Sequence, residues 1–309
     1  MHSSIYGYLT VFHTIAAEGS IAGAARKLQM ASPSISQSLK LLEQHIGLPL
    51  FNRTTRKMEL TEAGHHLLAS TQDAIAQLSV AVESVQDLSG VPKGVVRMTV
   101  PHVGYWLIIE PHLAEFCERY PDIQLEISIN DGTVDILKEG FDLGIRFGDK
   151  VDEQMVAKKL TAPFRLGLYA SSAYQQQFGL PKKIAELKNH RLVGFRFATS
   201  NRIFPLSLNN KGEEVSIEMP TPIVVNSLIV AKDVMKSGIA LGRFFEPLMS
   251  KQADQAAFIP VLEKHWKTFG ALYLYYMQHS QKAGRLRAVI EFFTEKAQVE
   301  KSNALKALE

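Results

Sequence analysis

The chain has 309 residues, enough for about two domains of ordinary size. Hydrophobic residues make up 46% and charged residues 21% of it, which excludes a largely disordered chain. The formal net charge is only +3, so a nucleic-acid interface would have to be a local patch. The single cysteine, Cys117, excludes an internal disulfide and a metal site built from thiolates alone.

The N-terminal residues do not have the pattern of a secretory signal, and no run approaches the roughly 18 apolar residues of a membrane span. We therefore expect a cytoplasmic protein with no membrane partner.

His65 and His66 are adjacent, not four residues apart on one helix face, so we predict no metal site and no cofactor. Cys117 follows Phe116 in an amphipathic pattern, and we expect a packed thiol.

Residues 1–60 carry six Lys and Arg against three Glu, whereas residues 61–93 carry one Lys against four acids. The basic excess is therefore local. Three short helices are predicted there. The first ends at Gly19, and the second follows Ser20 as its N-cap. The third has Ser32 as its N-cap and ends at Gly47.

Pro33 is expected at the first position of the third helix, where its missing N–H costs nothing. The spacing of apolar residues predicts a buried stripe of Ile35, Leu39, Leu42 and Ile46. Two helices joined by about three residues, the second with a polar outer face, indicate a helix-turn-helix. The stretch Leu48–Leu60 reads as a two-stranded wing.

Thr61 is expected to cap a long helix that ends near Leu88. It carries apolar residues at alternating steps of three and four, the pattern of a seam between two helices. We therefore predict a dimer, and the alternative is that the helix packs on its own chain. The predicted dimerisation residues are Leu68, Ile75, Leu78, Val82 and Val85.

Residues 90–94 contain Gly and Pro and are expected to form a hinge. Beyond them β-branched runs alternate with helical patterns, which predicts mainly parallel sheets. The strands are expected at 95–100, 125–129, 141–146, 165–170, 191–195, 223–225, 239–242 and 271–277, and the main helices at 105–120, 228–236 and 282–296.

Several ordered segments resemble the LysR-type transcriptional regulators over almost the whole chain. They are Gly19–Ala25, Ser32–Ser38, Gly47–Arg56, Leu60–Gly64, Asp142–Gly148 and Gly238–Leu241. The resemblance implies an N-terminal winged helix-turn-helix (1–60), a dimerising linker helix (61–89), a hinge (90–94) and an α/β effector domain (95–300). It also implies that the effector domain is of periplasmic-binding-protein type, with lobe I at 95–163 and 267–300 and lobe II at 164–266.

The family's contact positions fall on Ser32, Pro33, Ser36 and Gln37 of the third helix and on Arg53 and Arg56 of the wing. The helix would lie in the major groove of double-stranded promoter DNA. Gln37 can bond bidentately to adenine, whereas the arginines suit phosphates or the minor groove. The family commonly has a basic residue at the position of Gln37, so the base preference is expected to differ here.

By the same resemblance, the effector site is lined by Pro101, His102, Val103, Arg146, Phe147, Gly148, Phe195, Arg196, Asn226 and Arg243. Because residues 101–104 open a helix, we hypothesise an effector with a carboxylate, held at the helix N-terminus with Arg146 or Arg243. The alternative is that His102 is a structural hydrogen-bonding residue and both arginines form structural ion pairs.

The expected partners are thus promoter DNA, a small-molecule effector and a second copy of the chain in a homodimer or homotetramer, with RNA polymerase as a further candidate. An enzyme is disfavoured because no recognisable catalytic motif is present. The second alternative is a solute-binding protein without a DNA function. Binding to a palindromic DNA fragment distinguishes it from a regulator.

Overall fold

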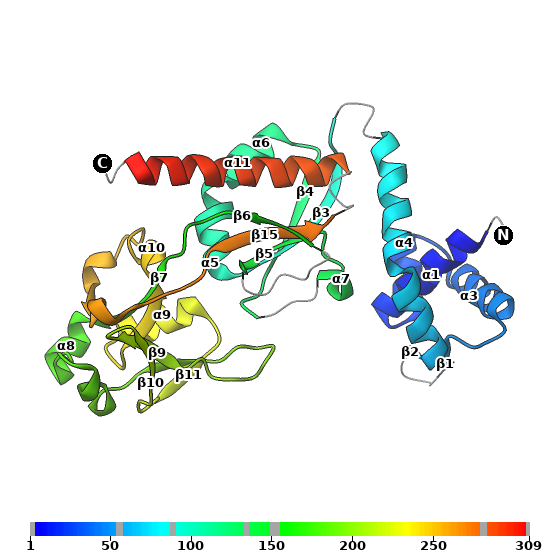
Figure 1. Cartoon of the computed structure of the whole chain (residues 1–309). Coiled ribbons are helices and arrows are strands. Elements are labelled where there is room, and N and C mark those ends of the chain that lie inside the picture. Colours follow the sequence, from blue (N-terminus) through cyan, green and yellow to red (C-terminus); the bar gives the residue numbers. More distant parts are fainter. Residues whose placement is uncertain are drawn as a thin grey trace. The chain divides into compact units, whose positions relative to one another are not determined.

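The computed structural model describes residues 4–53, 58–86, 91–132, 136–148, 155–278 and 283–306. The chain divides into a first unit, residues 1–91 with 279–284, and a second unit, residues 92–278 with 285–309 (Figure 1). Each unit is described by itself. Within the described ranges, no helix is both long and apolar enough to cross a membrane.

The first unit is built from three short helices, a β-hairpin and one long helix. Gly19 and Gly47 end α1 and α3 in the left-handed conformation, with φ of 63° and 80°. Ser20 caps α2, because its hydroxyl accepts the Gly23 N–H at 3.0 Å. The elements are α1 (Ile5–Glu18), α2 (Ile21–Leu28), α3 (Ser32–Ile46), β1 (Phe51–Arg53), β2 (Met58–Leu60) and α4 (Glu62–Gln86).

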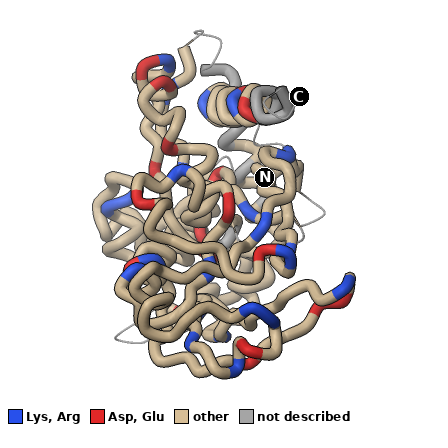
Figure 2. The backbone as a smooth tube through the Cα atoms, turned by 90° about the vertical axis from the view of Figure 1, so that its left-hand side faces the viewer, with Lys and Arg blue, Asp and Glu red and all other residues tan. Residues whose placement is uncertain are grey.

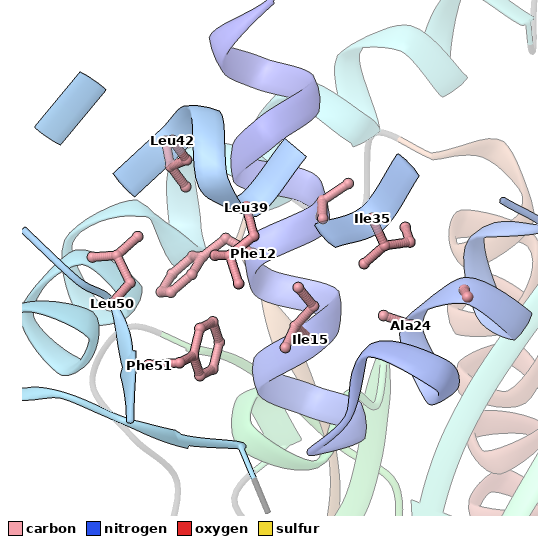
Figure 3. Close-up of a cluster of buried hydrophobic side chains, with 10 residues drawn as sticks. Phe12, Ile15, Ala24, Ile35, Leu39, Leu42, Leu50 and Phe51 are labelled. Atoms are coloured by element: carbon pink, nitrogen blue, oxygen red, sulfur yellow. The ribbon is translucent and has the colours of Figure 1, made fainter. Parts of the chain in front are cut away.

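One apolar core joins these elements (Figure 3). Phe12 and Ile15 of α1 meet the inner face of α3, where Ile35 and Leu39 are fully buried. The ring of Phe51 on the hairpin lies 5.5 Å from that of Phe12. Burial of such side chains stabilises the fold by about 2 kcal/mol each. The packing of its inner face therefore holds α3 in a fixed position, with its outer face exposed.

Two details of α3 differ from the sequence prediction. The helix begins at Ser32 itself, with Ala31 as its N-cap, so Ser32 is not the N-cap and Pro33 occupies the second helical position, not the first. Ile46 is 36% exposed and does not belong to the buried stripe. It is the last helical residue before Gly47, so no further turn covers it.

The start of α4 is fixed by a close approach to the hairpin. Thr61 donates its hydroxyl to the Pro49 carbonyl at 2.8 Å and accepts the Gly64 N–H at 3.0 Å. A Cβ on Gly64 would lie 2.2 Å from the Leu50 carbonyl oxygen, so a side chain does not fit there. Thr61 caps the helix as predicted.

The second unit contains two lobes, of which lobe I holds a five-stranded sheet in the order β4-β3-β5-β15-β6. Helices α6 and α11 meet at Phe116, whose ring lies 5.2 Å from Phe292 and 5.5 Å from Phe293. The strands are β3 (Gly94–Val100), β4 (Ile123–Ile129), β5 (Leu143–Phe147), β6 (Met155–Lys159) and β15 (Leu272–Met277). The helices are α5 (His102–Gly104), the π-helical turn η2 (Tyr105–Ile109), the 3₁₀ turn η3 (Glu110–His112), α6 (Leu113–Arg119), α7 (Ile136–Glu139) and α11 (Gly284–Lys306).

Lobe II is organised around β7, which pairs with β12, β13 and β14. Its strands are β7 (Arg165–Ser171), β8 (Val193–Phe195), β9 (Leu206–Asn210), β10 (Glu213–Ile217), β11 (Ile223–Val225), β12 (Gly242–Phe245), β13 (Phe258–Val261) and β14 (Lys267–Thr268). Its helices are α8 (Ser172–Phe178), α9 (Leu228–Lys236) and α10 (Glu246–Met249), with 3₁₀ turns η5 (Ile184–Asn189), η6 (Gln255–Ala257) and η7 (Glu263–His265).

The expectation of mainly parallel sheets is wrong for lobe II and for part of lobe I. β7 pairs antiparallel with all three of its neighbours, and β15 pairs antiparallel with β5 and β6. The chain crosses between the lobes at 160–164 and 269–271, and the two crossings are joined by a hydrogen bond from the Phe269 N–H to the Phe164 carbonyl (2.7 Å). The chain runs through the two crossings in opposite directions. The second crossing connects β14 and β15, and these strands are therefore antiparallel to β7 and β6, which the first crossing connects.

The prediction for Cys117 is also wrong, because the side chain is exposed on α6. Phe116 occupies the inward position of that helix, and the next residue points away from it.

Candidate DNA-binding surface and effector site

The outer face of α3 carries the residues predicted to contact DNA. Ser32, Pro33 and Gln37 are exposed, and Ser36 is half-buried. Pro33, Gln37, Lys40 and Gln44 follow one another at steps of four, three and four, so they form one exposed stripe opposite the buried face. This stripe has the size and polarity of a recognition helix.

The basic residues near α3 differ in what they contact. Lys40 on α3 and Arg26 near the end of α2 are exposed, and sequence reasoning did not single out either of them. Lys27 forms a surface ion pair with Glu18 at 2.9 Å. Arg53 ends β1, paired in register with Met58, while Arg56 lies outside the described residues.

The predicted seam on α4 divides into two parts. Near its start, Leu68 packs against the core of the first unit, and the Thr71 hydroxyl meets Nε2 of His13 at 2.8 Å. Farther along, Leu78 and Val82 are 51% and 58% exposed. Ile75 is half-buried, and Val85 lies in a part of the helix whose side chains are not described. The start of the helix thus packs on its own chain, while its later turns expose apolar side chains.

In lobe I, Asp131 occupies the N-terminus of α5. Its carboxylate accepts the His102 backbone N–H at 2.9 Å and meets the His102 Nδ1 at 2.8 Å. The His102 ring also lies 5.4 Å from the ring of Trp106, in the π-helical turn that follows. The chain therefore supplies its own anion at the position where we expected the effector's carboxylate.

Arg146 lies on β5 beside β3. Its Nη2 donates to the Thr99 hydroxyl at 2.8 Å, and its Nη1 donates to the Ile145 carbonyl at 2.7 Å. Its buried Nε has no hydrogen-bond partner among the described residues. Burial lowers the pKa of Arg146, against the opposing effect of negative charges that include Asp131. Its hydrogen bonds thus hold it to the sheet, and neither partner is an ion.

Seven phenylalanines form a continuous set of ring contacts across the two lobes, which we call the phenylalanine cluster. Phe269 is central, 4.5 Å from Phe147 and 5.6 Å from Phe245 between ring centroids. Phe204 continues the contacts into lobe II, 6.2 Å from Phe269 and 5.4 Å from Phe197. The members are Phe147, Phe164, Phe195, Phe197, Phe204, Phe245 and Phe269.

Arg243 on β12 lies against this cluster. Its guanidinium carbon is 4.5 Å from the centre of the Phe204 ring, a cation–π contact. The guanidinium donates to two carbonyl oxygens, those of Pro205 at 2.6 Å and Phe204 at 2.8 Å. Burial lowers the pKa of Arg243 to about 10. Both partners are neutral, which differs from the structural ion pair considered in the sequence analysis.

The remaining predicted effector residues have different environments. Pro101 and Val103 are buried beside His102, and a Cβ on Gly148 would lie 2.2 Å from the Tyr273 ring. Arg196 donates to the Asn201 carbonyl at 2.7 Å and so holds its own loop. Asn226 is exposed between β11 and α9. The structure thus joins Phe147, Phe195 and Arg243 in one aromatic group, and His102 and Arg146 in a polar group around Asp131.

Sequence reasoning missed Asp131 and five members of the phenylalanine cluster: Phe164, Phe197, Phe204, Phe245 and Phe269. They come from separate elements with no common motif, so no local sequence signal links them.

Figure 2 shows Lys and Arg interspersed with Asp and Glu along the second unit. Among the described residues, no group of His, Cys, Asp or Glu is arranged to hold a metal ion.

Comparison with known proteins agrees with this architecture. Residues 7–65 match the model of the bacterial regulatory helix-turn-helix protein, lysR family, and residues 89–298 match that of the LysR substrate binding domain. The Escherichia coli HTH-type transcriptional regulator PgrR is 28% identical over 276 residues, 89% of this chain and 92% of PgrR. Other similar relatives are also named as transcriptional regulators, DmlR of Escherichia coli among them.

Solved structures share the fold over nearly the whole chain. CrgA, a LysR-type transcriptional regulator from Neisseria meningitidis, is 25% identical with a TM-score of 0.60, covering 94% of this chain and 98% of CrgA. A full-length variant of AphB has a TM-score of 0.66 at 22% identity, covering 95% of this chain and 98% of AphB. The two matched models together span most of the chain, and they favour a regulator over a solute-binding protein without a DNA function. The chain therefore belongs to the LysR family of DNA-binding transcriptional regulators, with an effector-binding domain of the family's type.

Proposed function

We propose that α3 enters the major groove of promoter DNA with Ser32, Pro33, Ser36 and Gln37 toward the bases. The observation that carries this proposal is the exposed stripe on α3, which is supported from behind by fully buried Ile35 and Leu39. A rigidly seated helix can hold a side chain at a fixed distance from a base edge. Gln37 supplies the donor and the acceptor that adenine requires.

The proposed contacts to the DNA backbone come from around this stripe. Arg53 and Arg56 of the wing are assigned to phosphates or the minor groove. Exposed Lys40 and Arg26 extend the positive surface and are added to the phosphate contacts. Phosphate contacts determine register and salt dependence, whereas Gln37 determines part of the sequence preference.

We further propose that the later part of α4 pairs with the same helix of a second copy. Exposed Leu78 and Val82 lie four residues apart on one face, and a single helix in water does not bury them. By its spacing along the sequence, Val85 is assigned to the same seam together with Ile75, whereas Leu68 packs against the core of its own chain. A pair of heads matches a pseudo-palindromic site.

The second unit is proposed to control these heads through a small-molecule effector bound between its lobes. An effector shifts the paired heads only if its affinity differs between two arrangements of the chain. RNA polymerase is the proposed downstream partner at the promoter. The proposal assigns the chain no catalytic activity.

The test is binding of the purified full chain to a fluorescent pool of random duplex DNA at increasing salt. We expect the affinity to fall about a hundredfold or more between roughly 50 and 200 mM salt, because phosphate contacts release counterions. A variant with Arg26, Lys40 and Arg53 all changed to Gln should bind more weakly, and its affinity should fall less steeply as the salt concentration rises. Absence of binding by the unaltered chain at low salt would contradict the proposal.

A further inference from the structure

We propose that the effector is an aromatic carboxylate, bound with its ring against the phenylalanine cluster and its carboxylate at Arg243. The inference rests on the proposed effector-binding function and adds the chemical class of the ligand. Three features of the second unit carry it: incompletely buried rings, a cation with no acid partner among the described residues, and two contacts between the lobes.

The first feature is the exposure of the rings. Of the seven members of the phenylalanine cluster, only Phe245 is buried, and the other six are half-buried. Their contacts include edge-to-face pairs, such as Phe147 with Phe269 (interplanar angle 75°) and Phe204 with Phe269 (88°). A flat aromatic ligand can extend such a set of rings and remove the remaining apolar surface from water. An aliphatic chain offers no ring edge or face for these contacts.

The second feature is the charge of Arg243. Its two hydrogen bonds to the Phe204 and Pro205 carbonyls use two of the five N–H donors of a guanidinium. No carboxylate is paired with it among the described residues. A partly buried cation with neutral partners is electrostatically incomplete, and a carboxylate is the anion whose geometry a guanidinium fork matches.

The polar group of lobe I is a poorer site for that carboxylate. The N-terminus of α5 is already filled by Asp131, whose negative charge would repel an acid. Arg146 uses two nitrogens on Thr99 and Ile145, within reach of the same negative charge. Arg243 has no such competing carboxylate among the residues that the structure describes, and it lies directly over the Phe204 ring of the cluster.

The third feature is that members of the cluster lie at or next to two contacts that join the lobes. The crossings contribute Phe164 and Phe269. The loop of lobe II that follows Phe197 reaches lobe I, where a Cβ on Gly132 would lie 2.4 Å from the Thr199 hydroxyl oxygen. A ligand bound at the cluster would therefore touch both lobes, which is the condition for it to favour one arrangement of them.

The experiment is calorimetric titration of the purified full chain with four probes: phenylacetate, 3-phenylpropionate, hexanoate and 2-phenylacetamide. We expect both aromatic carboxylates to bind, and the aliphatic acid and the neutral amide to bind at least about tenfold more weakly. Equal affinity for phenylacetate and its amide would overturn the role of charge. Equal affinity for phenylacetate and hexanoate would overturn the role of the rings.

Variants test the two halves of the site separately. Arg243→Gln and Phe269→Leu should each weaken phenylacetate binding about tenfold or more, and Arg243→Lys should give a smaller loss. The matched controls are Arg191→Gln and Phe178→Leu, because this pair makes the same kind of contact at 5.1 Å outside the cluster. The controls should bind phenylacetate like the unaltered chain. Thermal unfolding of each variant verifies that it is folded, and unchanged binding by folded Arg243→Gln would overturn the proposal.

DNA binding measured on the same preparation separates this inference from the proposed function. A chain that binds DNA but none of the four probes overturns the aromatic carboxylate and leaves the regulator intact. A chain that binds phenylacetate but no DNA contradicts the proposed function instead.

Discussion

Nε2 of His13 on α1 lies 2.8 Å from the hydroxyl of Thr71 on α4. Because that hydroxyl donates to the Leu67 carbonyl at 2.6 Å, it accepts from the histidine. This hydrogen bond ties the linker helix to the DNA-binding head. It helps to set the direction in which α4 leaves the head, which in the proposed dimer would affect the spacing of the two heads.

Removing this bond is expected to loosen the head from the linker. Thr71→Val keeps the shape of the side chain and leaves His13 without its acceptor, which should cost about 1 kcal/mol of unfolding free energy. Urea unfolding of the full chain measures the loss. Thr10→Val is the control, since the Thr10 hydroxyl bonds within α1 to the Tyr6 carbonyl. An equal loss in both variants would mean that the contact between the helices contributes nothing specific.

The same histidine predicts a dependence on pH. Burial lowers the pKa of His13 below its ordinary value of 6.5, so the folded head prefers the neutral ring. Below that value the unfolded chain binds more protons, and stability is therefore lost as the pH falls from 7 toward 5. His13→Gln should unfold with a smaller pH dependence than the unaltered chain. Identical pH dependence in the two proteins would contradict the effect.

Gly64 is predicted to be essential to the packing of α4 on the wing. Gly64→Ala would bring a methyl group to 2.2 Å from the Leu50 carbonyl oxygen. We expect a loss of about 1–3 kcal/mol in unfolding free energy, because the backbone must shift. Gly7→Ala is the matched control: nothing lies within 4 Å of its added Cβ, and alanine there should be neutral or stabilising. Thermal unfolding of both variants tests the contrast.

The exposed part of the seam is predicted to hold the dimer together. Leu78→Glu with Val82→Glu places two like charges where the paired helices would exclude water, and it should raise the dissociation constant of the dimer about tenfold or more. Gln77→Glu adds a charge beside the seam and should leave the dimer intact. Sedimentation velocity distinguishes the species. A dimer that survives both seam substitutions would place the interface elsewhere.

Gln37 and Arg53 are predicted to act differently on DNA. Gln37→Ala should cost about 1–3 kcal/mol on the preferred site and relax discrimination at one position of each half-site. Arg53→Ala should weaken binding to all sequences and reduce the salt slope by about one. Fluorescence anisotropy with the preferred duplex and with single-base variants measures both. Uniform loss from both changes would contradict these roles.

The local structure of the head was largely predictable from the sequence. Gly19, Ser20, Gly47 and Thr61 act at the helix ends, where glycine permits a positive φ and a hydroxyl accepts a free N–H. The exposure of Ile46 was not predictable from spacing, since it depends on where the chain turns after the helix. Neither was the N-cap of α3: serine is the favoured residue at that position, yet the extended backbone that precedes the helix is that of Ala31.

The regulatory domain was predictable as alternating strands and helices, and α9 and β11 have their predicted bounds. Strand direction was not, because the antiparallel pairing of β12, β13 and β14 with β7 joins segments that are far apart in the sequence. The candidate effector site shows the same limit. Phe147 and Phe269, whose rings are in contact, are more than a hundred residues apart in the sequence. The contact between the Asp131 carboxylate and His102 likewise depends on the folded sheet.

Paired recognition of promoter DNA by α3 is tested most directly by sequencing the DNA that the purified full chain retains from a random duplex pool. We expect an enriched pseudo-palindrome whose half-sites lie about one or two helical turns apart, because two copies of α3 must reach adjacent major grooves. Retained DNA with no common sequence, or a single half-site without its mate, would show that α3 does not read DNA in pairs.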